Sequence, residues 1–458
     1  MAYDFKKKTD IFRFPSDVPL TDLDLMKFIS KNDAMCMVRY KPLQDAYDNR
    51  YEIFKLPKKP SWKPDSRISM NFAAEITDTF EGFLMGQPVT FSSDDETVQE
   101  YLTHLHSYAG QTDHTAELST LVSIFGRAYE IYYVDADGEI DMSYLSPMDS
   151  FMIFDDGIEP EPLYFVRTYY DQYARIRRGS ISDADFVRYF HIQGGIQWDG
   201  EPLPHGFDGV PATEYKQNVS RKGVFEDALS AVDAYNLVLS EKTNDVRALA
   251  DAYLKIVGAD IDKETLQWIR DNRIINLPST LDGKTPDIGF LGRPSADTTQ
   301  ENLLNRLEKN IFSTSNVVNL NSEGFQQASG KALRQRMQAM INLAGRKQRK
   351  LDEGFKRRYR LIFSNPCSGM ADDAWTEVSW KYNLMLPDVL GDEADTAGKL
   401  AGVVSKRTQL KVLSIVDDPD KEIEAMEEEQ ASVWTDGYDI DRTDKTDKTD
   451  KTDKDGDA

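Results

Sequence analysis

The chain has 458 residues, a length typical of about three domains, and its 40% hydrophobic and 29% charged side chains are ordinary for a soluble globular protein. A net charge of -23 argues against a protein that coats nucleic acid, because neutralising phosphates needs a basic surface. No apolar run approaches the roughly 18 residues of a membrane span, and the lysine-rich start lacks the apolar segment of a secretory signal. The two cysteines, Cys36 and Cys367, lie far apart in the sequence. They fit a reducing intracellular compartment, as buried or half-buried thiols.

The first 220 residues are predicted to form an α+β domain. Helical spacing of apolar residues predicts helices at 21–54 (interrupted at Pro42), 69–85, 94–108 and 112–125. Alternating patterns predict strands at 129–134, 139–145, 151–154, 163–170, 186–192 and 195–198. The residues Asp135-Ala-Asp-Gly138 begin like a calcium loop, but their glycine comes two positions too early, so they predict a hairpin turn.

Two long helices that enclose a small α+β insertion are predicted next. Apolar residues spaced by three, four or seven predict a helix at 223–257, ended by Gly258, and Pro294 opens a second helix that runs to about 312. Between them we expect a helix at 262–271 and strands at 274–277 and 288–291. This arrangement indicates a stalk with a knob on its end.

A polar loop at 316–329 leads from the stalk into a basic helix. Glu323 is its only charge, and Ser329 is a suitable N-cap for the helix that follows. The glycines resemble a phosphate-binding P-loop at first sight. Five residues rather than four separate Gly324 from Gly330, however, and Ala332 stands where a hydroxyl must hold magnesium, so we expect no nucleotide site.

Residues 330–363 contain no proline and are predicted to form one long helix. One face carries an apolar stripe, made of Leu333, Met337, Met340, Ala344, Leu351, Phe355, Tyr359 and Ile362. Only two acids, Asp352 and Glu353, accompany its basic residues, which are Lys331, Arg334, Arg336, Arg346, Lys347, Arg349, Lys350, Lys356, Arg357, Arg358 and Arg360. The helix is therefore strongly positive in a strongly negative chain.

The C-terminal part is predicted to be short elements followed by a tail. We expect a strand at 375–380 and helices at 392–403, 406–413 and 420–432, the last of them very acidic. Four Thr-Asp-Lys triplets between Thr443 and Lys454 offer no apolar face, so order is expected to fail from about residue 435.

No constellation of residues indicates catalysis. The five histidines, His104, His106, His114, His191 and His205, have no cysteine, acidic helix motif or glycine-flanked serine nearby and are interpreted as solvated. His104 and His106 stand two apart on a predicted helix, so they point to different sides and do not form a metal pair. We therefore expect no catalytic residue, no cofactor and no metal site.

The order of parts resembles the portal proteins of long-tailed, siphovirus-type bacteriophages of Gram-positive hosts, over nearly the whole chain. The motifs that carry this resemblance are Arg39-Tyr-Lys-Pro-Leu-Gln-Asp-Ala-Tyr47, Asn71-Phe-Ala-Ala-Glu-Ile76, Gly82-Phe-Leu-Met-Gly-Gln-Pro-Val89, Ser329-Gly-Lys-Ala-Leu333 and Ser405-Lys-Arg-Thr-Gln-Leu410 before Asp417-Asp-Pro-Asp420. The chain departs from the family at Asp48-Asn49, where a different turn is usual, and in its Thr-Asp-Lys tail.

The resemblance implies a mainly helical α+β portal fold with wing, stem, clip and crown, which assembles into a ring with a central DNA channel. Mapped on this sequence, these would be the wing 1–223, stem helices 224–257 and 295–315, the clip 258–294, the tunnel loop 316–329, the basic helix 330–371, the crown 372–433 and a disordered tail 434–458.

The implied function is a dodecameric ring at one capsid vertex of the virion, assembled in the host cytoplasm, through which double-stranded DNA is packaged and ejected. Its implied partners are the large subunit of terminase, the head-tail adaptor, and the major capsid and scaffolding proteins, without a membrane. Residues expected to face DNA in the tunnel loop are Asn316, Asn319, Asn321, Ser322, Glu323, Gln326 and Gln327. Residues expected to bind partners in the clip are Trp268, Ile274 and Ile288.

Alternatives stay open at this point. The loop 316–329 could be an ordinary surface connection. The basic residues of the following helix could pair with acids of neighbouring subunits or could face the channel. Pairing between subunits is favoured for most of them, among Lys331, Arg334, Arg336, Arg346, Lys347, Arg349, Lys350, Arg357 and Arg358. The protein could also be a nucleic-acid-associated ATPase or nuclease with an unrecognised site, or a monomeric capsid scaffold.

Overall fold

A computed structural model describes residues 11–61, 63–250, 254–257, 264, 287–290, 297–322, 330–385, 390–413, 416, 419 and 421–427. The chain divides into a first unit, Met1–Leu320 with Met337–Met385, and a second unit, Asn321–Arg336 with Leu386–Ala458. Helices and strands both contribute, which agrees with the predicted α+β class. Within the described residues, no helix combines the length and the apolar character needed to cross a membrane.

The first predicted helix is interrupted earlier than expected and ends earlier. Helix α1 (Asp22–Met35) passes through a π-helical turn (Cys36–Tyr40) into α2 (Lys41–Tyr47), so Pro42 lies in the first turn of α2. The chain leaves the helix at Tyr47 because Asn49 adopts a left-handed conformation with φ 60°. A 3₁₀ turn, Glu52–Lys55, follows.

Three more helices and a strand complete the N-terminal part of the first unit. Helix α3 (Phe72–Met85) is capped by Asn71, and strand β2 (Thr90–Ser93), which the sequence did not predict, follows it. Helices α4 (Glu96–Tyr108) and α5 (Gln111–Phe125) lie close to their predicted bounds. Helix α5 ends at Gly126, whose φ of 80° and close approach to the Arg221 carbonyl exclude a side chain.

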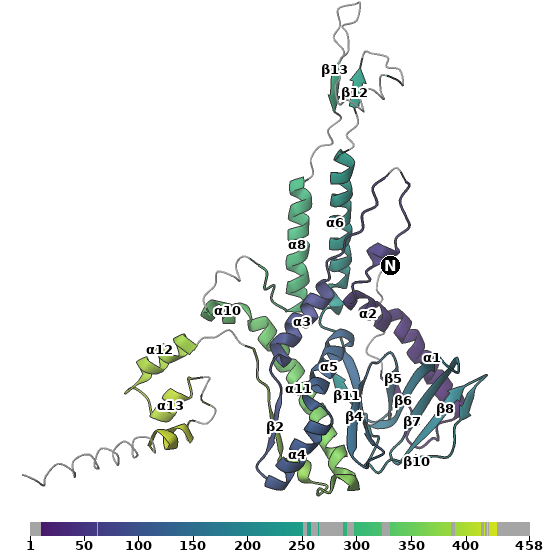
Figure 1. Ribbon diagram of the computed structural model, residues 1–458, viewed down its shortest axis with the longest axis vertical. Coiled ribbons are helices and arrows are strands. Elements are labelled where there is room, and N and C mark those ends of the chain that lie inside the picture. Colours follow the sequence, from purple (N-terminus) through teal and green to yellow (C-terminus); the bar gives the residue numbers. More distant parts are fainter. Residues whose placement is uncertain are drawn as a thin grey trace, which may run out of the picture. The chain divides into compact units, whose positions relative to one another are not determined.

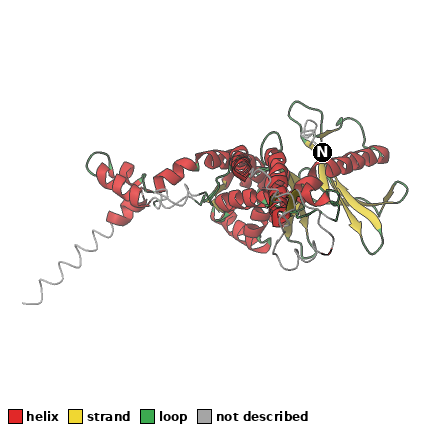
Figure 2. Cartoon of the chain, turned by 90° about the horizontal axis from the view of Figure 1, so that it is seen from above, coloured by secondary structure: helices red, strands yellow, loops and turns green. Residues whose placement is uncertain are grey.

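A seven-stranded sheet forms one side of the first unit, with the order β1-β5-β6-β7-β8-β10 and β9 paired with β8. Its strands are β1 (Phe12–Arg13), β5 (Ser150–Phe154), β6 (Pro162–Asp171), β7 (Ile176–Ser182), β8 (Phe186–Ile192), β9 (Ile196–Trp198) and β10 (Leu203–Pro204). Figure 2 shows the helix nearest the N-terminus running beside these strands. Leu25 and Ile29 of α1 pack there against Phe151 and Val166.

A second, three-stranded sheet has the order β11-β3-β4 and supports the basic helix. Its strands are β3 (Arg127–Val134), β4 (Ile140–Leu145) and β11 (Ala212–Lys216). The predicted hairpin turn is confirmed, because Asp135 and Gly138 close it and Gly138 has φ 86°. Strand β11, like β7, was not predicted.

The basic segment forms two helices rather than one, which corrects the prediction. Helix α10 (Gly330–Arg336) belongs to the second unit, and α11 (Gln338–Ser364) belongs to the first, with Met337 at the break. Helix α11 packs close to β11, where Gly354 lies so near the Tyr215 ring that a Cβ atom would come within 2.3 Å of it. Leu351, Phe355 and Tyr359 are buried in the same core.

Two helices lie side by side in the middle of the chain (Figure 1). Helix α6 (Leu229–Ala250) follows a 3₁₀ turn (Glu226–Ala228), and α8 (Asp297–Ser315) runs next to it. The predicted helix to residue 257 is wrong at its end, since Leu254–Val257 forms strand β12 and pairs with β13 (Asp287–Phe290). Apart from Glu264, the predicted helix 262–271 and strand 274–277 lie outside the described residues.

The strand and the first two helices of the C-terminal part are shorter than predicted. A 3₁₀ turn (Ala374–Glu377) precedes strand β14 (Val378–Lys381), which pairs with β2. In the second unit, α12 (Leu390–Leu400) and α13 (Lys406–Leu410) contact each other, and Ser405 caps α13 through the Thr408 N–H. Residues 421–427 are helical, and the Thr-Asp-Lys tail lies outside the described residues.

Candidate interaction sites

The described part of the predicted tunnel loop starts at the end of α8. Asn316 takes a left-handed conformation with φ 58°, which turns the chain away from the helix axis. Asn319 donates a hydrogen bond to Glu308 Oε1 at 2.7 Å, so the loop folds back along α8. Asn321 and Ser322 are exposed. Glu323, Gln326 and Gln327 lie outside the described residues.

Lys347 of the basic helix lies in the interior of the first unit rather than on its surface. Its side chain is fully buried, and its ammonium group donates to Glu81 Oε1 at 2.5 Å, to the Ser119 carbonyl and to Ser123 Oγ, each at 2.9 Å. All three N–H groups therefore have acceptors. Burial lowers the pKa of Lys347, and the Glu81 carboxylate opposes that shift.

Arg358 occupies a second buried site, beside strand β3. It forms a two-pronged ion pair with Glu130, at 2.9 Å from Nε and 2.7 Å from Nη2. Glu130 also accepts hydrogen bonds from Tyr132 and Tyr215. Burial would raise the pKa of Glu130, but the Arg358 charge and the hydrogen bond from His114 hold it well below its usual value.

These two sites correct the expectation that the basic residues pair with neighbouring subunits or face a channel. Lys347 and Arg358 are neutralised by acids of their own chain, because both stand on the buried stripe. Lys347 follows Ala344 by three positions and precedes Leu351 by four, and Arg358 has the same relation to Phe355 and Ile362. That spacing was visible in the sequence.

The other basic residues of the segment differ in exposure. Arg357 donates to the Val210 and Ala212 carbonyls at 3.2 and 3.3 Å, which binds it to its own chain. Lys350 pairs with Glu353 of the same helix, and Arg334 lies 3.7 Å from Glu393 within the second unit. Arg336, Arg346 and Arg349 are exposed, and the side chain of Lys331 is not described.

His114 is buried and His106 is half-buried, which corrects their interpretation as solvated. His114 lies 2.6 Å from Glu130 Oε1, and His106 lies 2.9 Å from the Tyr359 hydroxyl. Burial, aided by the Arg358 charge, lowers the pKa of His106 to about 4. Burial also raises the pKa of the Cys36 thiol to about 12, whereas Cys367 is exposed.

A long segment beside α6, residues 54–70, is here named the strap. Its two arms, 54–60 and 64–70, are joined by Arg67. All five N–H groups of the Arg67 guanidinium are used: it donates to the carbonyls of Phe54, Leu56 and Pro57 and to both carboxylate oxygens of Asp65. The two arms are therefore held as one body.

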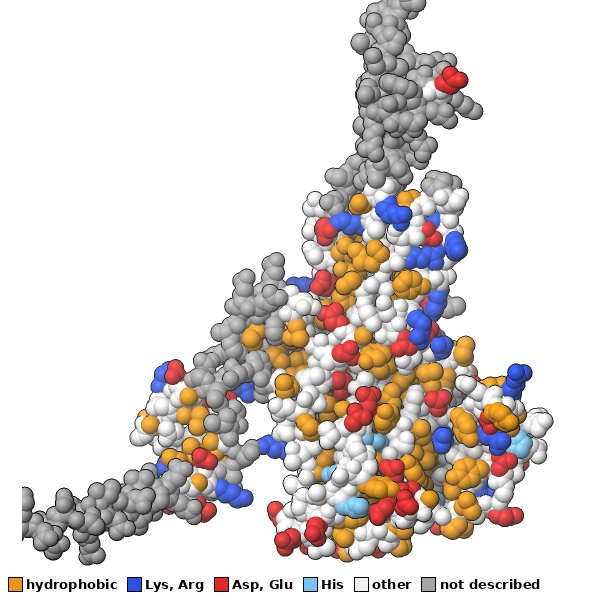
Figure 3. Space-filling model, in the orientation of Figure 1, with side chains coloured by type: hydrophobic (Ala, Val, Ile, Leu, Met, Phe, Trp, Pro, Cys, Tyr) orange, Lys and Arg blue, Asp and Glu red, His pale blue; other side chains and the backbone are white. Residues whose placement is uncertain are grey.

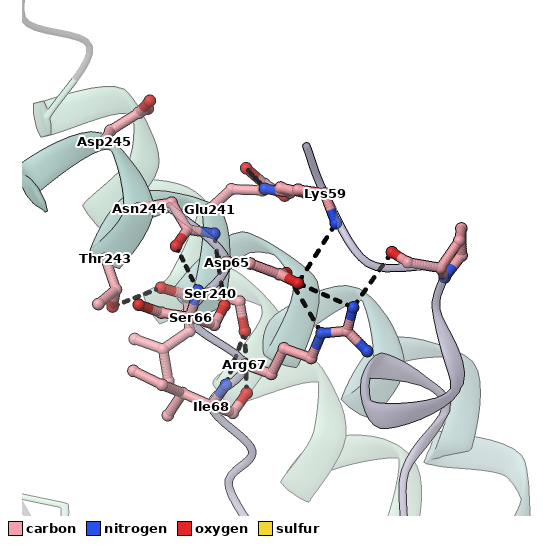
Figure 4. A network of polar contacts seen from close by, with 12 residues as sticks. Lys59, Asp65, Ser66, Arg67, Ile68, Ser240, Glu241, Thr243, Asn244 and Asp245 are labelled. Carbon is pink, nitrogen blue, oxygen red and sulfur yellow. Dashed lines mark hydrogen bonds and ion pairs between the residues drawn. The ribbon is translucent and has the colours of Figure 1, made fainter. Parts of the chain in front are cut away.

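The strap attaches to α6 through a ladder of polar side chains (Figure 4). Alternate residues of the arm 64–70 place their backbone groups against α6 side chains spaced by four, at distances of 2.6 to 3.3 Å. The pairs are Ser66 with Asn244, Ile68 with Ser240, and Met70 with Asn236. On the other arm, Lys59 forms an ion pair with Glu241. The strap is thus a fixed part of the stalk.

Comparison with known proteins identifies the family. The family model for phage portal proteins of the SPP1 Gp6-like type matches residues 26–433. The chain belongs to this portal protein family. It is 22% identical to the portal protein of Clostridium phage phiCD119, over 91% of this chain and 99% of that protein. It is 24% identical to the portal protein of Bacillus phage SPP1, over 80% of this chain and 76% of that protein.

Among solved structures, a chain from the neck of an empty GTA particle matches 74% of this portal protein and 89% of its own length, with 13% identity and a TM-score of 0.46. That similarity is too low to support an argument. Portal proteins are structural components of bacteriophage particles and not enzymes, so the predicted family and the predicted absence of enzymatic activity are both confirmed.

Proposed function

We propose that this portal protein forms a ring of twelve subunits at one capsid vertex, through which double-stranded DNA is packaged and later ejected. The observation that carries the proposal is the family match, which extends over residues 26–433 and so includes every part of the proposed assembly. The ring is proposed to join the major capsid protein during assembly with scaffolding protein in the host cytoplasm. ATP hydrolysis is assigned to a separate terminase.

We assign the parts of the ring by the resemblance to portal proteins. Residues 1–223 would be the wing, α6 and α8 the stem, and residues 258–294 the clip. Support for the stem comes from the contact of α6 with α8. Support for the clip comes from strands β12 and β13, which pair with each other and flank residues 258–286 in the chain. Residues 316–329 would be the tunnel loop, and residues 372–433 the crown.

Mass measurement of the purified protein in solution tests this proposal most directly. We expect a closed ring close to twelve subunits that does not hydrolyse ATP. A monomer that turns over ATP would contradict the proposal and favour an enzyme. A monomer without activity that still binds capsid proteins would favour a scaffold.

The clip is proposed as the docking site for the large subunit of terminase and, later, for the head-tail adaptor. Exposed strands in an insertion between two helices are suited to pairing with partners. Trp268, Ile274 and Ile288 are the residues proposed for these contacts, and the side chains of all three lie outside the described structure. Trp268→Asp and Ile274→Asp should abolish terminase binding while the ring still assembles. Unchanged binding by a folded variant would contradict the assignment.

The tunnel loop and the exposed cations are assigned to different contacts. The amides and hydroxyls of Asn316, Asn319, Asn321, Ser322, Gln326 and Gln327 are suited to weak, exchangeable contacts with a moving DNA backbone, while Glu323 would repel phosphate. Arg336, Arg346 and Arg349 remain candidates for ion pairs between acidic subunits, because a ring of like-charged copies needs such attractions.

A further inference from the structure

The strap is bound to its own chain through polar groups, which leaves its apolar side chains outside. Phe54, Leu56, Ile68 and Met70 are 36% to 46% exposed, although each belongs to a segment that is hydrogen-bonded in place. A loop held this rigidly loses little further entropy when a partner binds it. The strap therefore has the properties of a preformed docking surface.

The strap and α8 contact different sides of α6. Asn236, Ser240 and Asn244 face the strap, whereas Lys242 and Asp245 contact Glu301 and Gln300 of α8. At about 100° per residue, the centres of these two sets lie about 170° apart around α6. Figure 1 likewise shows α8 and the strap on either side of α6. The strap, α6 and α8 thus form three successive layers.

The outer layers also share one level along the stalk. Arg67 lies between Ser66 and Ile68, whose α6 partners are Asn244 and Ser240, so it is level with Lys242. Lys242 is bound to Glu301 of α8, two residues before Leu303. Arg67 also binds the carbonyls of Phe54 and Leu56, so these two strap residues lie at about the same position along α6 as Leu303. Leu303 is 44% exposed.

We infer that the strap of one copy docks against α8 of the next copy around the ring, with Leu56 and its neighbours packed on Leu303. This inference rests on the proposed ring. A ring needs a heterologous interface, in which two different patches of one subunit meet, and these patches lie on opposite sides of α6 at one level. Charge also favours a second copy of this chain as the partner, because the strap carries five cations and only one acid, whereas the whole chain has a net charge of -23. Figure 3 shows basic side chains gathered along that side of the stalk.

Disulfide cross-linking tests the contact in the full-length protein. In a background of Cys36→Ser and Cys367→Ser, the pair Leu56→Cys and Leu303→Cys should give covalent dimers, trimers and larger species on mild oxidation, up to a closed ring. A bond within one chain is excluded, because α6 is about 10 Å wide and a disulfide requires Cα atoms within about 7 Å. Each single cysteine variant is the control and should give no ladder.

Assembly provides the second measurement. Leu56→Glu with Ile68→Glu should reduce the ring to smaller species, while Leu203→Glu with Val219→Glu, at exposed apolar sites outside the strap, should leave it intact. Circular dichroism confirms that both variants fold. A wild-type protein that forms no ring would overturn the proposed function together with this inference.

A wild-type ring that yields no ladder, together with normal assembly of the strap variant, would overturn the inference alone. If that variant ring then failed to enter procapsids, the strap would instead face the capsid shell.

Discussion

Several long cationic side chains in this protein are buried or half-buried and use most of their donors. Lys347 uses three donors, Arg67 uses five, and Arg39 forms a buried ion pair with Glu226 at 2.8 Å. A buried charge costs several kcal/mol of desolvation, which only good geometry and additional hydrogen bonds offset. Such groups therefore make the packing of their helices specific, because a shifted helix would leave a charge without a partner.

The contribution of Lys347 to stability should depend on the charge of Glu81. We expect Lys347→Met to lower the free energy of unfolding by about 3 to 5 kcal/mol, since it leaves a buried carboxylate unpaired. The double variant Lys347→Met with Glu81→Gln should recover most of that loss. Lys350→Met, which removes a surface pair, should cost less than about 1 kcal/mol. Chemical denaturation measures all three, and equal losses in the single and double variants would contradict the coupling.

His106 should make the fold sensitive to mild acid. Its pKa is about 4 in the fold against 6.5 in the unfolded chain, so the unfolded chain takes up the proton first as the pH falls. The contribution of His106 to the free energy of unfolding is therefore fully present above pH 6.5. It is lost as the pH falls from 6.5 to 4, and the loss amounts to about 3 kcal/mol. His106→Gln should flatten this part of the stability curve, whereas His104→Gln, at an exposed position, should not. Identical slopes for all three proteins would show that His106 does not titrate in this way.

At the scale of elements, the strap fits α6 because two repeats match. Four residues of a helix rise about 6.0 Å, and two residues of an extended chain span about 6.6 Å, so alternate strap residues meet every fourth α6 residue. The ladder has only one good register, since Val232 and Ala248, the next positions on either side, carry no hydrogen-bonding side chain. The strap thereby fixes the position of α6 relative to the segments at both of its ends.

Removal of the ladder should release the strap from α6. In the variant Ser240→Ala with Asn244→Ala, we expect trypsin to cut between Arg67 and Ile68 much faster than in the wild type, because this bond must leave its docked conformation to enter a protease. Glu241→Ala removes an exposed ion pair at the same place and is the control, for which little change is expected. Mass spectrometry of the fragments identifies the cut. Equal rates in all three proteins would mean that the ladder does not hold the strap.

Local patterns predicted most of the elements, and their failures have physical causes. Strand β7 has the sequence Ile-Arg-Arg-Gly-Ser-Ile-Ser, whose polar residues give no alternating apolar pattern. It forms a strand because β6 and β8 pair with it on either side. The helix break at Met337 follows no proline or glycine signal. The ladder on α6 could not be predicted, because polar residues such as Asn236, Ser240 and Asn244 are common on helix surfaces. Their hydrogen-bond partners lie in the strap, about 170 residues earlier in the chain. Long-range polar pairing of this kind leaves no periodic trace in either partner.

At the scale of the whole molecule, charge is separated rather than mixed. The chain carries a net charge of -23, yet α10, α11 and the strap are rich in basic residues, and two of those in α11 form ion pairs with buried acids. The segment 316–322 that follows α8 carries no charge at all. A channel that lets a duplex slide benefits from few cationic contacts, because each phosphate that is neutralised tightens binding. This separation is therefore consistent with a subunit whose loop faces DNA.

The last prediction tests that arrangement directly. Glu323→Lys with Gln326→Lys should leave the ring assembled but slow the passage of DNA, because every subunit would add two cations to the channel. Each phosphate contact steepens the dependence of log affinity on log salt by about 0.9 for duplex DNA, so packaging should stall at low salt and recover partly as salt is raised. The measurement is the length of packaged DNA against ionic strength. Asp444→Lys with Thr446→Lys makes the same change of net charge in the C-terminal tail and should package normally. If the loop variant packaged like the wild type at every salt concentration, the loop would not face DNA.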